Sequence, residues 1–150
     1  MSRPAASQLD DRIVAAVTAL SDRGDSAVEA GLYDEAIACY REALALVPHP
    51  VHAWAVSTFL HAAIAEAHYL AGEPARARDA IDDAFRCEGA IGNAFLHLRL
   101  GQIELTLGNR GRAVDELVRA YTRAGEEVFA DEDPKYLTLV HETLGDRSAS

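Results

Sequence analysis

A pattern of small and large apolar residues recurs three times in this chain and constrains its fold more than any other feature. Each copy has a glycine, an alanine five residues later, a large apolar residue at nine and a second alanine at twelve. The copies are Gly31, Ala36, Tyr40 and Ala43; Gly72, Ala77, Ile81 and Ala84; and Gly108, Ala113, Leu117 and Ala120. Because the internal offsets are identical, we interpret the pattern as a repeated structural unit rather than one alanine-rich helix.

Each unit is predicted to be a pair of antiparallel helices. A further small residue lies seven positions before each repeat glycine, at Gly24, Ala65 and Gly101. A small side chain at that position lets a neighbouring helix approach closely, although glycine lowers helix propensity by up to ~1 kcal/mol. One helical hairpin cannot bury its apolar face alone, so the units are expected to stack.

The expected fold is all-α: an α-solenoid of three hairpins and a C-terminal capping helix, forming a single domain over residues 1–150. The expected helices span about 8–30, 34–47, 51–71, 74–87, 92–107, 110–125 and 134–145. They group into units of about 8–48, 51–89 and 92–125. The first two repeat glycines are 41 residues apart and the next two 36, so we expect the third helix to be lengthened and to carry Trp54 on its extension. Ser7 with Asp10, and Asp133 before Pro134, are typical helix starts.

These units resemble the tetratricopeptide repeat family, whose pattern is W-x2-L-G-x2-Y, then A-x3-F, then P. Ala36, Tyr40 and Pro48 match its second half, and Leu100 with Gly101 matches the L-G pair of the third unit. The resemblance covers roughly residues 17–125 and is closest to small, bacterial-type proteins with three repeats. It implies a concave groove, lined by the first helix of each unit, that binds a helical or extended segment of another protein.

The repeat register places particular residues in that groove. Certain family members grip a peptide's C-terminal carboxylate with Lys, Arg and Asn there, but here only Arg99 is near, so we do not expect a carboxylate clamp. Phe59, Tyr69, Phe95 and Leu98 are expected to supply apolar anchors, and Asp25 and Glu66 an acidic border. The candidate groove residues are Asp25, Phe59, Glu66, Tyr69, Phe95, Leu98, Gln102 and Leu105. The sequence leaves open whether the long third helix covers part of this face.

The overall charge excludes some classes of partner. Asp and Glu outnumber Lys and Arg by 24 to 14, which gives a formal net charge of −10. A nucleic-acid-binding protein needs a clustered basic face, so we predict a protein partner that is basic or has an apolar stripe. No apolar run approaches the ~18 residues of a membrane span. The N-terminal region is not a typical signal peptide, and Cys39 and Cys87 are expected to be free thiols, so a cytoplasmic location is predicted.

The sequence does not indicate an enzyme, and we expect no cofactor and no metal. None of the six histidines forms the i, i+4 pair typical of a zinc helix. His61, His68 and His97 lie at repeat positions that normally hold packing aromatic residues, so interhelical packing is expected for them. A dense acidic run lacks the spacing of a calcium loop and is either a solvated connector or a docking patch: Glu126, Glu127, Asp131, Glu132 and Asp133.

The predicted function is therefore a non-enzymatic protein–protein interaction module. One concrete role is an immunity protein that neutralises a basic toxin, because acidity steers association with a cationic partner. The alternative is a secretion-type chaperone that holds an apolar segment of an exported protein. A histidine-dependent metal hydrolase is a remote alternative, and a homodimer is left open.

Overall fold

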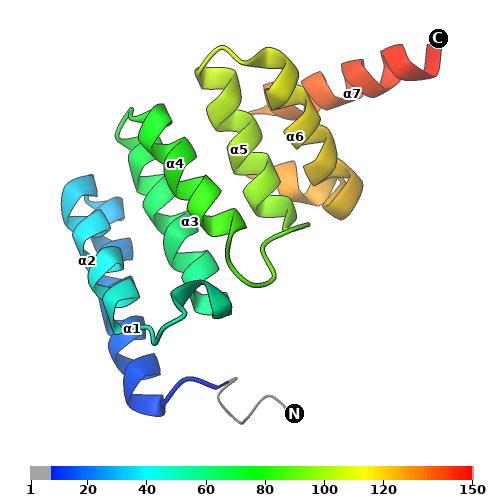
Figure 1. Cartoon of the computed structure of the whole chain (residues 1–150). Coiled ribbons are helices and arrows are strands. Elements are labelled where there is room, and N and C mark those ends of the chain that lie inside the picture. The colour runs from blue at the N-terminus through cyan, green and yellow to red at the C-terminus, as the bar shows by residue number, and fades with distance from the viewer. Residues whose placement is uncertain (1–7, 150) are drawn as a thin grey trace, which may run out of the picture.

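Three antiparallel helical pairs followed by one further helix make up the computed structural model, which describes residues 8–149 (Figure 1). No strand occurs among these residues, so the all-α prediction is confirmed. The pairs stack side by side, and α7 lies at the end of the stack. The helices are α1 (Asp11–Glu29), α2 (Tyr33–Leu46), α3 (Ala55–Leu70), α4 (Pro74–Phe85), α5 (Ala94–Thr106), α6 (Arg110–Ala124) and α7 (Pro134–Ala149), with short 3-10 helices η2 (Val51–Ala53) and η3 (Gly125–Phe129).

The repeat glycines end the first helix of each unit in the same way. Gly31, Gly72 and Gly108 have φ values of 75°, 77° and 86°, in the left-handed region that favours glycine. In each unit the next residue donates its backbone N–H to the carbonyl five residues earlier, as in a Schellman motif. These bonds are Leu32 N–H to Ala27 O (2.8 Å), Glu73 N–H to His68 O (2.9 Å) and Asn109 N–H to Glu104 O (2.9 Å). The three turns are therefore equivalent, as the repeat predicts.

Small residues bring the two helices of a unit together. Ala36, Ala77 and Ala113 are fully buried at equivalent positions on α2, α4 and α6. Gly24 of α1 lies against the ring of Tyr40, and Gly101 of α5 lies against Leu117. The apolar offsets that repeat in the sequence are thus the contacts that close each hairpin.

Gly101 is a packing glycine whose replacement should be costly. A Cβ added there would lie 2.7 Å from Cδ2 of Leu117 and 3.1 Å from the carbonyl oxygen of Ala113. We expect Gly101→Leu to lower the free energy of unfolding by about 1–3 kcal/mol through overpacking, despite leucine's better helix propensity. Gly111 in α6 is the matched control, because a Cβ there meets nothing within 4 Å. Thermal melting of both variants checks this; a Gly101→Leu melt at or above wild type would contradict it.

The start of α3 differs from the prediction. The helix begins at Ala55 rather than near Val51, and Trp54 has an extended backbone before it instead of lying on a longer helix. Prolines at 48 and 50 limit helix formation in this stretch, and residues 51–53 form only one 3-10 turn. The Trp54 indole Nε1–H donates to Pro48 O (2.9 Å), and the Ser57 hydroxyl donates to Val51 O (2.6 Å). The extra residues of the second unit therefore form a loop.

The C-terminal segment also differs from the prediction in extent. Asp133 caps α7 as expected, accepting the Lys135 N–H at 2.9 Å. Pro134 is the first residue of α7, also as expected. The helix continues to Ala149, four residues beyond the expected end. At the N-terminus, Asp10 accepts the Arg12 N–H and caps α1, whereas Ser7, its predicted capping partner, lies outside the described residues.

Candidate functional site

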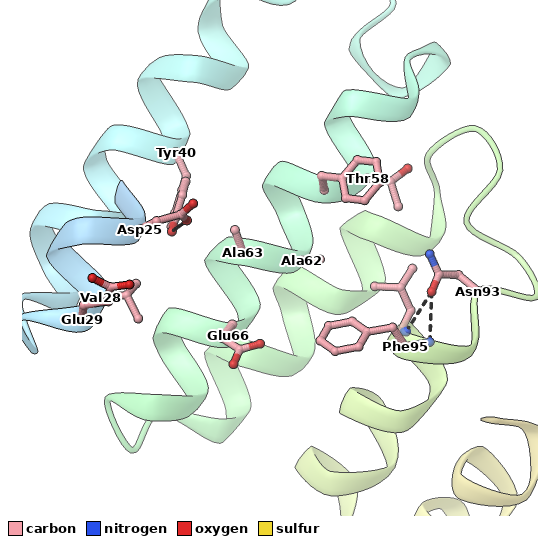
Figure 2. Close-up of a pocket in the computed structure, with 12 residues that line it drawn as sticks. Asp25, Val28, Glu29, Tyr40, Thr58, Ala62, Ala63, Glu66, Asn93 and Phe95 are labelled. Atoms are coloured by element: carbon pink, nitrogen blue, oxygen red, sulfur yellow. Dashed lines mark hydrogen bonds between the residues drawn. The ribbon is translucent and has the colours of Figure 1, made fainter. Parts of the chain in front are cut away.

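One hollow, here called the groove, opens along α3 between α1 and α5 (Figure 2). It has a volume of about 580 Å³. Figure 2 shows that Asp25 and Glu29 of α1 face Glu66 of α3 and Phe95 of α5 across it. The lining residues are Asp25, Val28, Glu29, Tyr40, Thr58, Phe59, Ala62, Ala63, Glu66, Asn93, Phe95 and Leu96. The groove thus contains four of the eight predicted site residues: Asp25, Phe59, Glu66 and Phe95.

Two aromatic side chains of the groove are unusually exposed. Phe59 of α3 is 70% exposed and Phe95 of α5 is 44% exposed. Ala62, Ala63 and Glu66 follow Phe59 at helical spacing and form the rest of the face that α3 presents to the groove. The alanines make a shallow floor between the aromatic and acidic ends. Contiguous exposed apolar surface with a polar rim is typical of an interaction site.

Carboxylates border the groove. The Tyr40 hydroxyl donates to Oδ1 of Asp25 at 2.6 Å and so fixes this side chain at the groove wall. Burial, together with this bond to Asp25, raises the pKa of Tyr40 above its usual value. Glu29 lies one helical turn after Asp25 and is exposed. With Glu66 opposite, these groups give the groove an acidic edge.

Arg99 of α5 is held internally beside the groove. Its Nη2 lies 3.0 Å from Oε2 of Glu66 and 3.6 Å from Oε1 of Glu132. Its Nη1 donates to Oε1 of Gln102 at 2.6 Å. The guanidinium carbon lies 5.0 Å from the centre of the Phe95 ring, a distance at which a cation and an aromatic face attract each other. The Arg99 side chain is only 10% exposed. Its charge is therefore paired with carboxylates of the same chain and is not available to bind a carboxylate of a partner.

Beyond its first turn, α5 of the third unit does not contribute to the open groove, contrary to prediction. Leu98 and Gln102 are buried, and Leu105 is half-buried. Leu98 packs in one apolar cluster with residues of α6, η3 and α7: Leu117, Ala120, Phe129, Tyr136, Leu139 and Val140. The C-terminal segment, not a longer third helix, therefore covers this face. The capping helix predicted for residues 134–145 was the sequence feature that pointed to this cover.

Tyr69 lies at the boundary between the open and covered parts. Its side chain is half-buried and packs on the main core. Its hydroxyl lies 3.4 Å from that of Tyr136 in α7. Tyr69 is thus not among the residues that line the groove, although it was predicted to supply an apolar anchor there.

The acidic run divides into two kinds of residue. Glu132 faces inward and accepts the Gln102 side-chain N–H (3.0 Å) in addition to its ion pair with Arg99. Asp133 caps α7. Glu126, Glu127 and Asp131 are exposed, and Oε1 of Glu126 lies 3.3 Å from Nε2 of His141. The run is therefore a structured connector with four exposed carboxylates, of which that of Asp133 caps α7.

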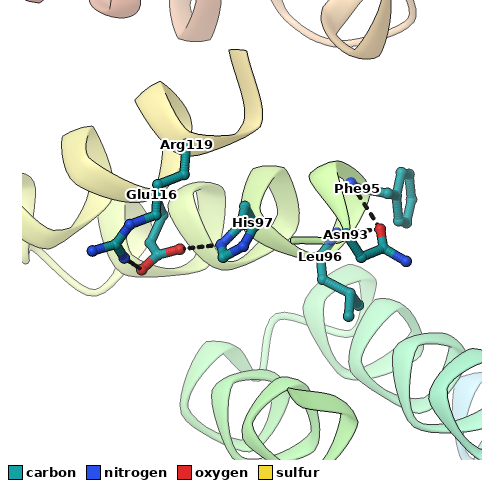
Figure 3. A network of polar contacts seen from close by, with 6 residues as sticks. All are labelled: Asn93, Phe95, Leu96, His97, Glu116 and Arg119. Carbon is teal, nitrogen blue, oxygen red and sulfur yellow. Dashed lines mark hydrogen bonds and ion pairs between the residues drawn. The ribbon is translucent and has the colours of Figure 1, made fainter. Parts of the chain in front are cut away.

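The three histidines that were expected to pack, His61, His68 and His97, are buried or half-buried on α3 and α5. His97 of α5 contacts Glu116 of α6 through its Nδ1 at 2.6 Å, with Arg119 on the same carboxylate (Figure 3). The Phe85 ring of α4 lies 5.0 Å from the His97 ring. His68 is buried, with its Nδ1 3.1 Å from Glu73. Burial lowers the pKa of His61. Within residues 8–149 no three His, Cys, Asp or Glu side chains are grouped as a metal site would require.

Two further expectations concern the cysteines and membranes. Cys39 is half-buried and Cys87 is buried, and both are free thiols, as expected. Across the described part of the chain, no helix combines the length and apolar character needed to cross a bilayer.

Comparison with known proteins agrees with this architecture. A family model, Tetratricopeptide repeat, matches residues 17–50. A crystal structure of MamA is similar with a TM-score of 0.61 and 17% identity, covering 89% of this chain and 81% of that one. The first TPR of Spaghetti (RPAP3), bound to the HSP90 peptide SRMEEVD, has a TM-score of 0.64 and 18% identity, covering 90% and 97%. No curated protein sequence matches significantly.

Proposed function

We propose that this chain, whose residues 17–50 match the Tetratricopeptide repeat model and whose fold is similar to a solved TPR structure, is a non-enzymatic module that binds a segment of a partner protein in the groove. The observation that carries this proposal is the exposure of Phe59 and Phe95 in a groove that Ala62 and Ala63 also line. Large rigid side chains of this kind supply most of the binding energy at protein interfaces. The similar structure bound to an HSP90 peptide supports a peptide-binding role for this fold.

We propose that the partner segment is apolar with basic flanks. Asp25, Glu29 and Glu66 border the groove, and the nearby Arg99 already pairs with Glu66 and Glu132. An acidic peptide such as SRMEEVD would meet like charges here. Basic flanks would instead gain attraction, mostly as a faster association rate at low salt.

Two cellular roles follow from this chemistry. An immunity protein that neutralises a basic toxin accords with the acidic groove and the net charge of −10, and we propose it as the first role, in the cytoplasm. A chaperone for an exported protein is the alternative, which the exposed apolar aromatics favour. A complex that abolishes a toxic activity of the partner supports the first, and a complex that releases an unfolded partner for export supports the second.

Hydrogen exchange on the complex tests the proposed function. A partner captured with the full chain as bait is purified with it, and amide exchange is compared with that of the free chain. We expect slower exchange in peptides that cover residues 59–66 and 93–96. Helix α6, none of whose residues lines the groove, serves as the internal control. Protection confined to residues 126–133 would contradict the proposal and place the site on the connector.

A further inference from the structure

We infer that the partner segment enters the groove as an amphipathic helix rather than as an extended strand. This inference rests on the proposed function and specifies the class of partner: a helix with apolar residues at i, i+3 and i+4 and with Lys or Arg on the flanks. Three features of the groove carry it.

The first feature is that few hydrogen-bond donors of the groove are free to pair with the carbonyl groups of an extended backbone. An extended segment exposes its own N–H and C=O groups, and burying them without partners costs free energy. The groove walls are helices whose backbone groups are already bonded. The Tyr40 hydroxyl already donates a hydrogen bond to Asp25, and the Thr58 hydroxyl already donates one to the carbonyl oxygen of Glu88 (3.2 Å).

The amide side chains near the groove are engaged wholly at Gln102 and through the oxygen at Asn93. Oδ1 of Asn93 accepts the N–H groups of Phe95 and Leu96 at 3.0 and 3.3 Å as the cap of α5 (Figures 2 and 3). Gln102 accepts from Arg99 and donates to Glu132. A helix satisfies its own backbone and needs none of these groups, so the groove favours a helical occupant.

The second feature is how the chain covers the equivalent face of the third unit. Ala62 of α3 and Leu98 of α5 occupy the same repeat position, 36 residues apart. Tyr136, Leu139 and Val140 of α7 lie in the apolar cluster that buries Leu98, at spacings of i, i+3 and i+4. In the second unit the equivalent positions hold Ala62 and Ala63, where the third unit has Leu98 and Arg99, and these alanines line the open groove. A partner helix with apolar residues at i, i+3 and i+4 would therefore fit the open face of the second unit.

The third feature is the shape and charge of the open face. Ala62 and Ala63 in the floor allow the close approach that helix–helix packing requires. The apolar contacts are Phe59 at one end and Phe95 at the side, while Asp25, Glu29 and Glu66 lie at the edges. This distribution complements a helix with one apolar stripe between basic flanks.

Two synthetic peptides of identical composition test the inference. Both contain about 18 leucine and lysine residues, one with leucines at i, i+3, i+4 and i+7, the other with leucine and lysine alternating as in a strand. Their affinities for the full chain are measured by fluorescence anisotropy, and circular dichroism reports helix formation on binding. Because charge and composition are equal, non-specific attraction to an acidic protein contributes equally.

We expect the helical pattern to bind at least tenfold more tightly, to gain helix on binding, and to lose this advantage in Phe59→Ala and Phe95→Ala. Leu46→Ala is the matched control, because Leu46 is 42% exposed on α2 and does not line the groove. Equal or tighter binding of the alternating peptide, or no binding of either, would overturn the helical inference. The proposed function would survive if binding of the alternating peptide still required Phe95. Sedimentation showing a dimer that Phe95→Ala dissociates would also overturn it and make a second copy the occupant.

Discussion

Replacing Arg78 with methionine is expected to lower the free energy of unfolding by about 3 kcal/mol, because it removes a partner from a buried carboxylate. Glu104 of α5 has no exposed side-chain surface. Its Oε1 lies 3.4 Å from Nη1 of Arg78 in α4, and its Oε2 accepts from Nδ2 of Asn109 at 2.9 Å. Arg112 is more distant, at 3.9 Å. The network joins the second and third units, so its loss should destabilise the stack at that junction.

Arg86→Met provides the matched control for this prediction. Arg86 pairs with Asp83 at 3.3 Å, almost the same separation, but both side chains are largely exposed. Exposed pairs contribute about 0–1 kcal/mol, so Arg86→Met should change the denaturant midpoint little. A second substitution, Glu104→Leu, should recover part of the stability lost in Arg78→Met. Equal effects of Arg78→Met and Arg86→Met in chemical denaturation would show that Glu104 does not depend on its buried partner.

The hairpins could be predicted from sequence because their determinants are local and repeated. Gly31, Gly72 and Gly108 each require a left-handed turn, and the alanines five residues later lie at close helix contacts. The start of α3 was less predictable. The prolines indicated a break, but the side-chain bonds that hold Trp54 in a loop join residues whose pairing depends on the folded backbone.

The sequence could not show that four of the eight predicted groove residues lie outside the open groove, and the reason here is different. Repeat register placed Phe59 and Phe95 correctly at the groove, but it treats all units as equally open. Leu98 is buried because η3 and α7 return over it, and this path is held by Glu132 on Arg99 and Gln102. Such contacts link side chains about 30 residues apart and follow no periodic pattern. The exposed surface is therefore smaller than the repeat alone indicates.

Phe95→Ala is expected to weaken partner binding by more than about 2 kcal/mol, or roughly 30-fold, while leaving helical content unchanged. Phe95 lies in the first turn of α5, half exposed, with its ring held over the Arg99 guanidinium. A ring placed in this way loses little conformational freedom when a partner covers it. Titration calorimetry with the purified partner measures the loss, and circular dichroism checks the fold.

Charge neutralisation at the groove edge should have a smaller effect of a different kind. Glu66→Gln is expected to cost under about 1 kcal/mol of affinity, mostly through slower association at low salt. Because Glu66 also holds Arg99, Glu29→Gln is the better probe of charge alone.

The dissociation constant of the partner complex, measured for four chains under one salt condition, tests the central claim most directly. These chains are the wild type, Phe95→Ala, Leu46→Ala and a variant with Glu126, Glu127 and Asp131 neutralised. The groove account predicts a roughly 30-fold loss for Phe95→Ala and near-wild-type affinity for the other two variants. Unchanged affinity in Phe95→Ala, with collapse in the connector variant, would contradict it and make the connector the binding site.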